Sequence, residues 1–283
     1  MEVNATIVDE YNPDNNDIVY YYCSAETFRN IMCSKTMWLC DVKRMNDCEE
    51  ITYGQNIFFD LMKKLRIPEL RKDEIEYYYN LFHNNLVTLS ICFSESSEIL
   101  SQWRGYADDA KGFCIGFNAK KLKSALPFCP LKIVYDYNKQ KELITKKLND
   151  VLCHIVNKTP AYESIIGELL FIFAQIKHPS FKEEREIRFV HNIILNEDNS
   201  LTDSVKEECK QYRDILNGIF FRMVNNIPSP YVETSFMLNE KDSPVEEILI
   251  GSKNNSTAFD VQLFLKYCGF NDVQIRRFDS SYT

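Results

Sequence analysis

Short blocks of apolar residues alternate with polar stretches along the chain, and in its first half they predict strands separated by helices. Blocks rich in β-branched and aromatic residues predict strands at 18–23, 37–40, 86–94 and 112–118. Apolar residues spaced by three and four predict helices over 25–34, 48–65, 69–85 and 119–125. Ser24 is a suitable cap for the first helix, and Pro68 separates the second helix from the third.

The second half of the chain continues the same mixture of elements. Alternating or β-branched segments predict strands at 131–137, 184–192, 231–236, 246–250 and 273–277. Amphipathic or strongly apolar segments predict helices over 138–157, 160–177 and 255–267. Asn255 or Ser256 would cap the last of these helices. Between the strands, residues 193–227 are expected to form a polar loop and one helix.

The order of these elements predicts an α+β fold. Strands and helices do not alternate strictly, which disfavours a doubly wound parallel sheet. No internal repeat or linker divides the chain, so residues 18–283 are expected to form one domain, with a mixed or antiparallel sheet flanked by helices. Residues 1–17 are polar and contain turn residues, and we expect them to form a loose N-terminal lead.

The composition narrows the ways in which this chain could bind a nucleotide. Its 283 residues include eight glycines, no two of which lie closer than four residues. A Gly-rich phosphate loop of the P-loop or Rossmann type is therefore not expected, and side chains would have to hold a nucleotide. Lys and Arg number 33 against 41 Asp and Glu, and this net charge of −8 disfavours a basic nucleic-acid-binding domain.

The N-terminal residues and the cysteines bear on compartment and metal binding. The N-terminal stretch lacks the features of a secretory signal, and no apolar run approaches the roughly 20 residues of a membrane span. We therefore expect a cytoplasmic protein with reduced thiols and no membrane partner. The ten cysteines lack the paired spacing of zinc sites, and the four histidines fit no metal or triad pattern, so no metal is expected.

The most distinctive polar pattern is Glu184-Arg185-Glu186-Ile187-Arg188 on a predicted strand. Residues two apart on a strand share a face, so Glu184, Glu186 and Arg188 should project together. This row is compatible with the solvated face of an antiparallel strand. The alternative is a cleft in which a cation keeps one carboxylate ionised, so that it stabilises an oxocarbenium-like centre or orients a ribose hydroxyl.

A second candidate is the segment 101–106 (SQWRGY), which we expect to be a polar turn after a buried strand. Trp103 could be a core residue, with Arg104 in a structural ion pair. Alternatively, Arg104 would bind a phosphate or carboxylate, while Trp103 or Tyr106 would offer a stacking surface. Gln102 belongs to the same candidate group.

A third candidate is the tyrosine-rich strand that precedes the first helix. Tyr20 and Tyr22 share one face of this strand, and Tyr21 takes the other. These residues could simply form a β core. In the alternative, a tyrosine hydroxyl points into a cleft beside the helix N-terminus at Ser24, where anions are favoured.

A fourth candidate is the polar segment 45–50 (MNDCEE). Asp47 followed three residues later by Glu50 is a variant of the capping box, which would make both residues structural. In the alternative, Asn46, Asp47 or Glu50 contacts a ligand. The sequence pattern leaves both interpretations open.

Four segments together resemble a known family: 19–24 (VYYYCS), 38–50 (WLCDVKRMNDCEE), 100–117 (LSQWRGYADDAKGFCIGF) and 181–188 (FKEEREIR). They are similar to the bacterial family catalogued as domain of unknown function 2971. The later segments 246–251 (EEILIG) and 269–270 (GF) also fit. The resemblance extends over about residues 18–280, nearly the whole chain.

That family is distantly similar to ADP-ribosyltransferases, so the resemblance implies a split β-sheet around NAD. The usual first motif of the family, His-Tyr-Thr, corresponds here to Tyr21-Tyr22-Cys23, where a tyrosine hydroxyl would bond a ribose oxygen. The Glu-x-Glu of this chain is similar to the catalytic pair of another transferase class. By that resemblance Glu186 is the principal expected catalytic residue and Glu184 is its companion.

The resemblance implies an NAD-consuming ADP-ribosyltransferase or NAD glycohydrolase, with NAD as substrate. Tyr21 or Trp103 would stack on nicotinamide, and Arg104 or Arg188 would meet the pyrophosphate. The acceptor macromolecule is open. Because the family occurs among bacterial anti-phage defence genes, the resemblance also suggests a toxic or immune effector with an antitoxin or defence-system partner. The alternative function is a non-catalytic sensor that keeps the fold and binds a nucleotide or a protein.

Overall fold

The computed structural model describes residues 10–44, 50–65, 67–156, 162–195, 198, 200–203, 216–239, 242–279 and 282. Within these residues eleven strands form one sheet. The strands are β1 (Ile18–Cys23), β2 (Thr36–Asp41), β3 (Leu86–Ser94), β4 (Phe113–Asn118), β5 (Cys129–Lys132), β6 (Glu186–Leu195), β7 (Leu201–Asp203), β8 (Leu216–Val224), β9 (Ile227–Ser235), β10 (Val245–Ile250) and β11 (Gln274–Arg277). Only β10 and β11 pair in parallel, so the sheet is mixed and mostly antiparallel, as predicted.

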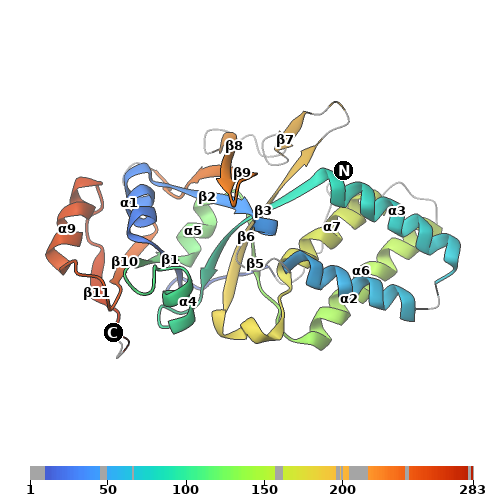
Figure 1. Cartoon of the computed structure of the whole chain (residues 1–283), viewed down its shortest axis with the longest axis horizontal. Coiled ribbons are helices and arrows are strands. Elements are labelled where there is room, and N and C mark those ends of the chain that lie inside the picture. The colour runs from blue at the N-terminus through green and yellow to red at the C-terminus, as the bar shows by residue number, and fades with distance from the viewer. Residues whose placement is uncertain are drawn as a thin grey trace.

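Helices flank this sheet, which confirms the predicted α+β fold class (Figure 1). They are α1 (Ala25–Ser34), α2 (Glu50–Lys64), α3 (Glu69–Asn85), α4 (Leu100–Gly105), α5 (Ala119–Ala125), α6 (Tyr137–Val156), α7 (Tyr162–Gln175) and α9 (Ala258–Tyr267), with the 3₁₀ turns η1 (Val42–Arg44) and η2 (Pro179–Glu184). Figure 1 shows α2, α3, α6 and α7 gathered at one end of the molecule and α1 and α9 at the other. None of the described helices combines the length and the apolar character that a membrane span requires.

Two apolar cores correspond to these two ends. The sheet core contains Leu89 and Ile115, both fully buried, and the helical core contains Phe58 and Phe173, also fully buried. β3 and β6 connect the two parts, because β3 directly follows α3 and β6 follows α7 by way of η2. Apolar burial on this scale is the main favourable contribution to folding.

The sheet divides at β3. One edge of β3 pairs with β6 along its whole length. The other edge contacts β1 through the pair Tyr20 and Ser94, and β2 through the pair Cys40 and Ser90. Between these contacts, residues 91–93 have no paired strand on that edge within the described part of the chain. β1 and β2 therefore diverge from a common neighbour, β3, and leave a gap between them.

The start of α1 forms as the sequence predicts. The hydroxyl oxygen of Ser24 accepts a hydrogen bond from the backbone N–H of Thr27 at 3.2 Å, which satisfies one of the free donors at the helix start. The cap of α9 is different from the prediction. Thr257, rather than either of the two preceding residues, caps this helix, because it forms a reciprocal capping box with Asp260.

The prediction of a loop and one helix over 193–227 is wrong for the residues that the structure describes there. β6 continues to Leu195, β7 follows, and β8 forms a hairpin with β9. Asn225 and Asn226 make the turn with φ values of 50° and 64°. Two-residue turns with positive φ match the twist of paired strands, and Asn tolerates this conformation. The Asn-Asn pair was therefore the sequence signal for the hairpin.

Three other boundaries differ from the predictions. Residues 100–105 form the helix α4 instead of a turn. The strand expected at 131–137 lies earlier, since β5 ends at Lys132. The strand expected from Glu184 begins only at Glu186, because Arg185 has a left-handed backbone conformation (φ 47°) that ends η2.

The part of the expected loose lead that the structure describes, residues 10–17, is held in place. The backbone N–H of Tyr11 donates to the carbonyl of Pro130 at 2.8 Å. The ammonium group of Lys123 contacts the carbonyl of Tyr11 and the side chain of Asn12. Tyr11 also packs against the sheet core. The polar sequence suggested a loose segment because it does not show which distant groups bind it.

Candidate functional site

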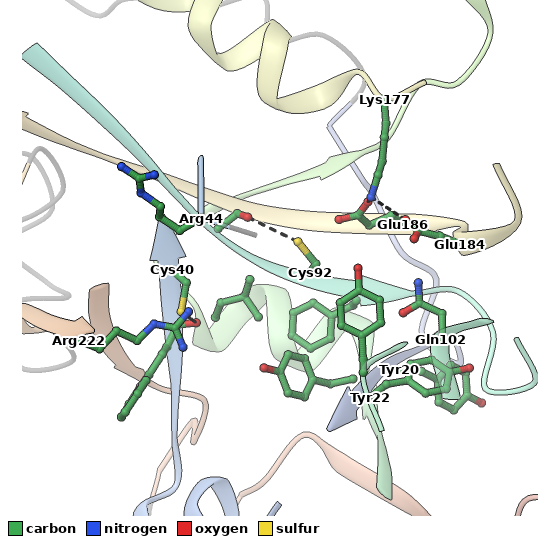
Figure 2. Close-up of a pocket in the computed structure, with 16 residues that line it drawn as sticks. Tyr20, Tyr22, Cys40, Arg44, Cys92, Gln102, Lys177, Glu184, Glu186 and Arg222 are labelled. Atoms are coloured by element: carbon green, nitrogen blue, oxygen red, sulfur yellow. Dashed lines mark hydrogen bonds and ion pairs between the residues drawn. The ribbon is translucent and has the colours of Figure 1, made fainter. Parts of the chain in front are cut away.

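A cavity of about 250 Å³ lies where β1 and β2 diverge from β3. Its walls come from these three strands, from η1 and β8, and from α4 and the residue that follows it. Lys177, before η2, the last residue of η2 and the first residue of β6 complete them. Figure 2 shows two differently charged ends: Lys177, Glu184 and Glu186 lie at one end, and Arg44 and Arg222 lie at the other. Aromatic side chains from β1 and β3 contribute to the wall between them.

Lys177 joins the two carboxylates at the first end. Its ammonium nitrogen lies 2.6 Å from Oε2 of Glu184 and 3.2 Å from Oε2 of Glu186. The side chain of Lys177 is 3% exposed, so these ion pairs are shielded from water. Glu184, on η2, and Glu186, on β6, therefore meet as predicted, but through a shared cation and not through the face of one strand.

Glu186 and Arg188 share a face of β6, as the strand pattern predicted. Nε of Arg188 donates to Oε1 of Glu186 at 2.6 Å, and Nη2 donates to Oε2 at 3.0 Å. Nη1 of Arg188 donates to the carbonyl of Ala174 at 3.1 Å. Arg188 is 1% exposed and does not line the cavity, so its expected contact with a pyrophosphate is not available in this structure.

The two carboxyl groups have opposite pKa shifts. For Glu186, burial alone would raise the pKa, but the positive charges of Arg188 and Lys177 outweigh it and lower the pKa well below its usual range. For Glu184, burial is the larger influence and raises the pKa, although Lys177 opposes it. The cavity therefore contains one firmly ionised carboxylate beside one that is protonated more easily.

The three tyrosines of β1 have different surroundings. The hydroxyl of Tyr20 donates to Oε1 of Glu247 at 2.8 Å, and burial together with this bond raises the pKa of Tyr20 to about 12. The hydroxyl of Tyr22 donates to the carbonyl of Ser96 at 2.8 Å. The hydroxyl of Tyr21 has no hydrogen-bond partner among the described residues. Of the three tyrosines, Tyr21 is therefore the one whose hydroxyl is available to a ligand.

Residues 102–106 divide between the core and the cavity because they form a helical turn. Trp103 is fully buried, donates from Nε1 to the carbonyl of Ser97 at 2.9 Å, and stacks on Phe278 with ring centroids 4.8 Å apart. It is a core residue and cannot stack on nicotinamide. Gln102 and Tyr106, four residues apart, both line the cavity.

The remaining expected ligand contacts lie elsewhere or outside the described residues. Arg104 does not line the cavity; its guanidinium lies 5.6 Å from the ring centroid of Tyr282. Ser24 does not line the cavity either, and its hydroxyl caps α1. Asn46 and Asp47 lie outside the described residues, as does the side chain of Glu50.

Several residues of the site were not expected from the sequence, among them Trp38 on β2, Arg44 on η1, Lys177 after α7 and Arg222 on β8. Lys177 directly precedes the predicted helix break at 178–180, and its polarity at the end of an apolar helix was a usable signal. Arg222 lies in the segment for which no strand was predicted. No local feature of Trp38 distinguishes it from a core residue.

Arg222 is the cation of the site for which the described residues supply no hydrogen-bond or ion-pair partner. Its Nε atom is buried and has no hydrogen bond, and no ion pair joins it to a carboxylate of the described residues. Arg44 makes one long contact, 3.9 Å from its Nε to Oδ2 of Asp41, and its side chain is 40% exposed. A buried donor without an acceptor is costly, so this end of the cavity suits an anion. Within the described residues, no group of His, Cys, Asp and Glu side chains is arranged to hold a metal ion.

Comparison with known proteins identifies one family. Residues 102–189 match the family described as "Protein of unknown function (DUF2971)". No curated protein and no solved structure matches the chain. The matched segment runs from the cavity wall at Gln102 to β6, and so it contains Lys177, Glu184 and Glu186. The description of the family says nothing about ADP-ribosyl transfer. Over residues 102–189 this chain matches the model of domain of unknown function 2971, the family that its motifs resemble.

Proposed function

We propose that this cavity cleaves the N-glycosidic bond of NAD, passing ADP-ribose to an acceptor macromolecule or to water. The main support is the pair of carboxylates, Glu184 and Glu186. Their pKa values shift in opposite directions, and both line the cavity where β1 and β2 diverge from β3. Pairs of titratable groups whose surroundings separate their pKa values are a recognised sign of acid–base or electrostatic catalysis.

Glu186 would supply electrostatic stabilisation. Breaking a glycosidic bond places positive charge on the sugar, and a fixed carboxylate stabilises that charge in the transition state. Arg188 and Lys177 keep Glu186 ionised and hold it in one orientation. A single preorganised group of this kind contributes roughly 10²–10³ in rate.

Glu184 would serve the sugar hydroxyls or the acceptor. One of its carboxylate oxygens binds Lys177, and burial makes the group easier to protonate than an exposed carboxyl. A carboxyl that is protonated more easily than an exposed one is suited to take up and return a proton during the reaction. Glu184 is therefore placed to bond a ribose hydroxyl or to activate the acceptor, with Lys177 as its positioning residue.

The residues present also fit the rest of a dinucleotide substrate. The free hydroxyl of Tyr21 can bond a ribose oxygen, and the unpartnered Nε of Arg222 can donate to a phosphate oxygen. These contacts would come from side chains, the kind of contact expected of a nucleotide site in a chain with few glycines. Such an enzyme would act in the cytoplasm, where it would meet NAD, and would suit a toxic effector of anti-phage defence under the control of a partner protein.

Nicotinamide release from NAD tests this proposal. Wild-type protein should release nicotinamide, and Glu186→Gln should reduce the rate by about two to three orders of magnitude. Because Glu186→Gln leaves Arg188 without its partner, folding must be verified by circular dichroism. Glu184→Gln is the second test, since it leaves the Glu186–Arg188 pair intact, and the exposed Glu183→Gln is the matched control. Equal rates in the wild type and both site variants would contradict the proposal.

One observation favours a second function, nucleotide binding without turnover. Both oxygens of Glu186 are already bound, by Arg188 and Lys177, as in a buried structural ion pair. In that case NAD or ADP-ribose would raise the unfolding temperature of the protein while no nicotinamide appears. A thermal-shift series combined with product analysis separates this sensor function from catalysis.

A further inference from the structure

Three aromatic rings from neighbouring strands form a continuous stack that ends at the cavity. Trp38 of β2 stacks on Tyr231 of β9, with ring centroids 4.3 Å apart and an interplanar angle of 27°. Tyr231 stacks in turn on Phe220 of β8, at 5.6 Å and 30°. Trp38 lines the cavity, whereas Tyr231 and Phe220 do not. The stack therefore presents its last ring, that of Trp38, to the cavity.

Trp38 has a ring face available to a ligand. Trp38 is 41% exposed, and among the described residues its indole stacks on the ring of Tyr231. Nε1 of Trp38 donates to Oε1 of Glu233 at 2.7 Å, which fixes the orientation of the indole. A fixed, partly exposed indole at a cavity wall is a suitable platform for a planar heteroaromatic ring.

Arg222 lies beside this platform for a structural reason. Phe220 and Arg222 are two residues apart on β8, so they project from the same face of the hairpin. Tyr231 pairs with Phe220 across the hairpin and with Cys40 of β2 on its other side. The same face therefore carries the aromatic stack and the guanidinium that reaches the cavity.

The charges at this end favour an anion. Arg222 and Arg44 are the cations that line it. Two acids lie near these cations: Glu233 accepts from Nε1 of Trp38, and the buried Asp41 accepts the backbone N–H of Lys43 at 2.9 Å and lies 3.9 Å from Nε of Arg44. The Nε of Arg222 has no partner within the described chain, so a phosphate oxygen would satisfy it.

We propose that this end of the cavity is a nucleotide-recognition subsite, in which Trp38 stacks on a nucleobase and Arg222, with Arg44, binds the phosphate attached to it. The inference rests on the proposed function, because it assigns a site to the half of NAD that does not carry nicotinamide. The expected ligand is a 5′-phosphorylated nucleoside. The indole of Trp38 would bind its base, and the two guanidinium groups would bind its phosphate. Neither a free nucleoside nor inorganic phosphate uses both parts.

The two tryptophans of the chain make this subsite directly measurable. Trp38 lines the cavity and Trp103 is fully buried, so only Trp38 can report a ligand by contact. ADP-ribose and AMP should quench the tryptophan fluorescence of the wild type on titration. Trp38→Phe should remove the quenching while retaining binding by calorimetry, because it keeps an aromatic ring. Trp38→Leu should weaken binding about tenfold.

Arg222→Gln tests the phosphate contact. It should raise the Kd of AMP and ADP-ribose about tenfold or more and leave the weak binding of adenosine unchanged, because adenosine has no phosphate. Arg222→Lys should recover part of the affinity, since it keeps the charge but loses the fork of donors. Arg29→Gln, on the exposed face of α1, is the matched control and should leave every Kd unchanged.

The outcomes separate this subsite from the proposed catalysis. Binding of ADP-ribose can be measured without catalysis. Quenching by ADP-ribose that depends on Trp38 and Arg222 therefore supports the subsite even when NAD yields no nicotinamide. Nicotinamide release with a KM that neither Trp38→Leu nor Arg222→Gln changes would overturn the subsite and leave the catalysis standing. Absence of binding by AMP and ADP-ribose, or quenching that persists in Trp38→Phe, would also overturn it.

Discussion

Glu184 and Glu186 contact the same ammonium group, that of Lys177, yet their pKa values move in opposite directions. Glu184 has this one cation as its ion-pair partner, so burial dominates and raises its pKa. Glu186 has Arg188 as well, in a bidentate pair, and two cations outweigh burial. The number of cations within contact therefore decides the protonation of each carboxyl, and this asymmetry leads to the first two predictions.

Acid should weaken the fold through Glu186. Because the folded-state pKa of Glu186 is lowered from 4.5 to about 2, its contribution to stability is present above pH 4.5 and is lost as the pH falls from 4.5 through about 2. Glu184 has the opposite sign, since its pKa is raised and protonation favours its folded state. Thermal unfolding between pH 2 and pH 7 should show a steeper loss for the wild type than for Glu186→Gln. Parallel curves would contradict the prediction.

The two carboxylates should differ in their contribution to stability at neutral pH. Glu186→Gln leaves Arg188 and Lys177 buried with one charge fewer and should cost about 3–5 kcal/mol of unfolding free energy. Glu184→Gln leaves Lys177 paired with Glu186 and should cost about 1 kcal/mol. Urea denaturation of both variants measures the difference. Equal destabilisation by the two substitutions would show that Lys177 depends on both partners alike.

The two tryptophans should respond differently to truncation. Trp103 is fully buried between Tyr22 and Phe278, so Trp103→Ala should cost about 3–5 kcal/mol. Trp38 is partly exposed and loses mainly its stacking on Tyr231, so Trp38→Ala should cost about 1 kcal/mol. Both losses of unfolding free energy can be measured from the denaturant midpoints, provided that the denaturant dependence of the unfolding free energy is unchanged. A larger loss for Trp38 than for Trp103 would reverse the assignment of core and cavity residues.

Two glycines near the site should tolerate alanine very differently. A methyl group on Gly112 would overlap the carbonyl oxygen of Cys23, a backbone atom that cannot move aside easily. Gly112→Ala should therefore fold poorly or not at all. A methyl group on Gly105, at the end of α4, would meet no atom within 4 Å. Gly105→Ala should be neutral or should stabilise the protein by about 0.5–1 kcal/mol, as measured by thermal unfolding.

Oxidation should join two helices that are distant in sequence. Sγ of Cys33, at the end of α1, lies 3.7 Å from Sγ of Cys268, just after α9, and Cys33 is exposed. Diamide, which accepts the two thiol hydrogens, should convert this pair to a disulfide. Peptide mass spectrometry should detect the 33–268 crosslink, whereas Cys23 should remain reduced, because it is buried and diamide does not reach its thiol. Oxidation of Cys153 without the crosslink would contradict the prediction.

Local sequence patterns determined much of the fold. β-Branched and aromatic runs predicted β1 and β3, three–four spacing predicted α2 and α3, and Ser24 marked the start of α1. The pleat of a strand was enough to place Glu186 and Arg188 on one face. These inferences succeeded because each depends on residues that are close in the chain, where backbone geometry alone sets which side chains are neighbours.

Only the tertiary structure decided which of these elements share a site. It placed Trp103 in the core and Trp38 on the cavity wall, although both are tryptophans in short segments beside polar residues. It brought Lys177 between Glu184 and Glu186 through the left-handed turn before β6, and it carried the unpredicted hairpin strand with Arg222 to the same cavity. The cavity exists because β1 and β2 diverge from β3, and strand order arises from contacts between distant residues that no local periodicity encodes.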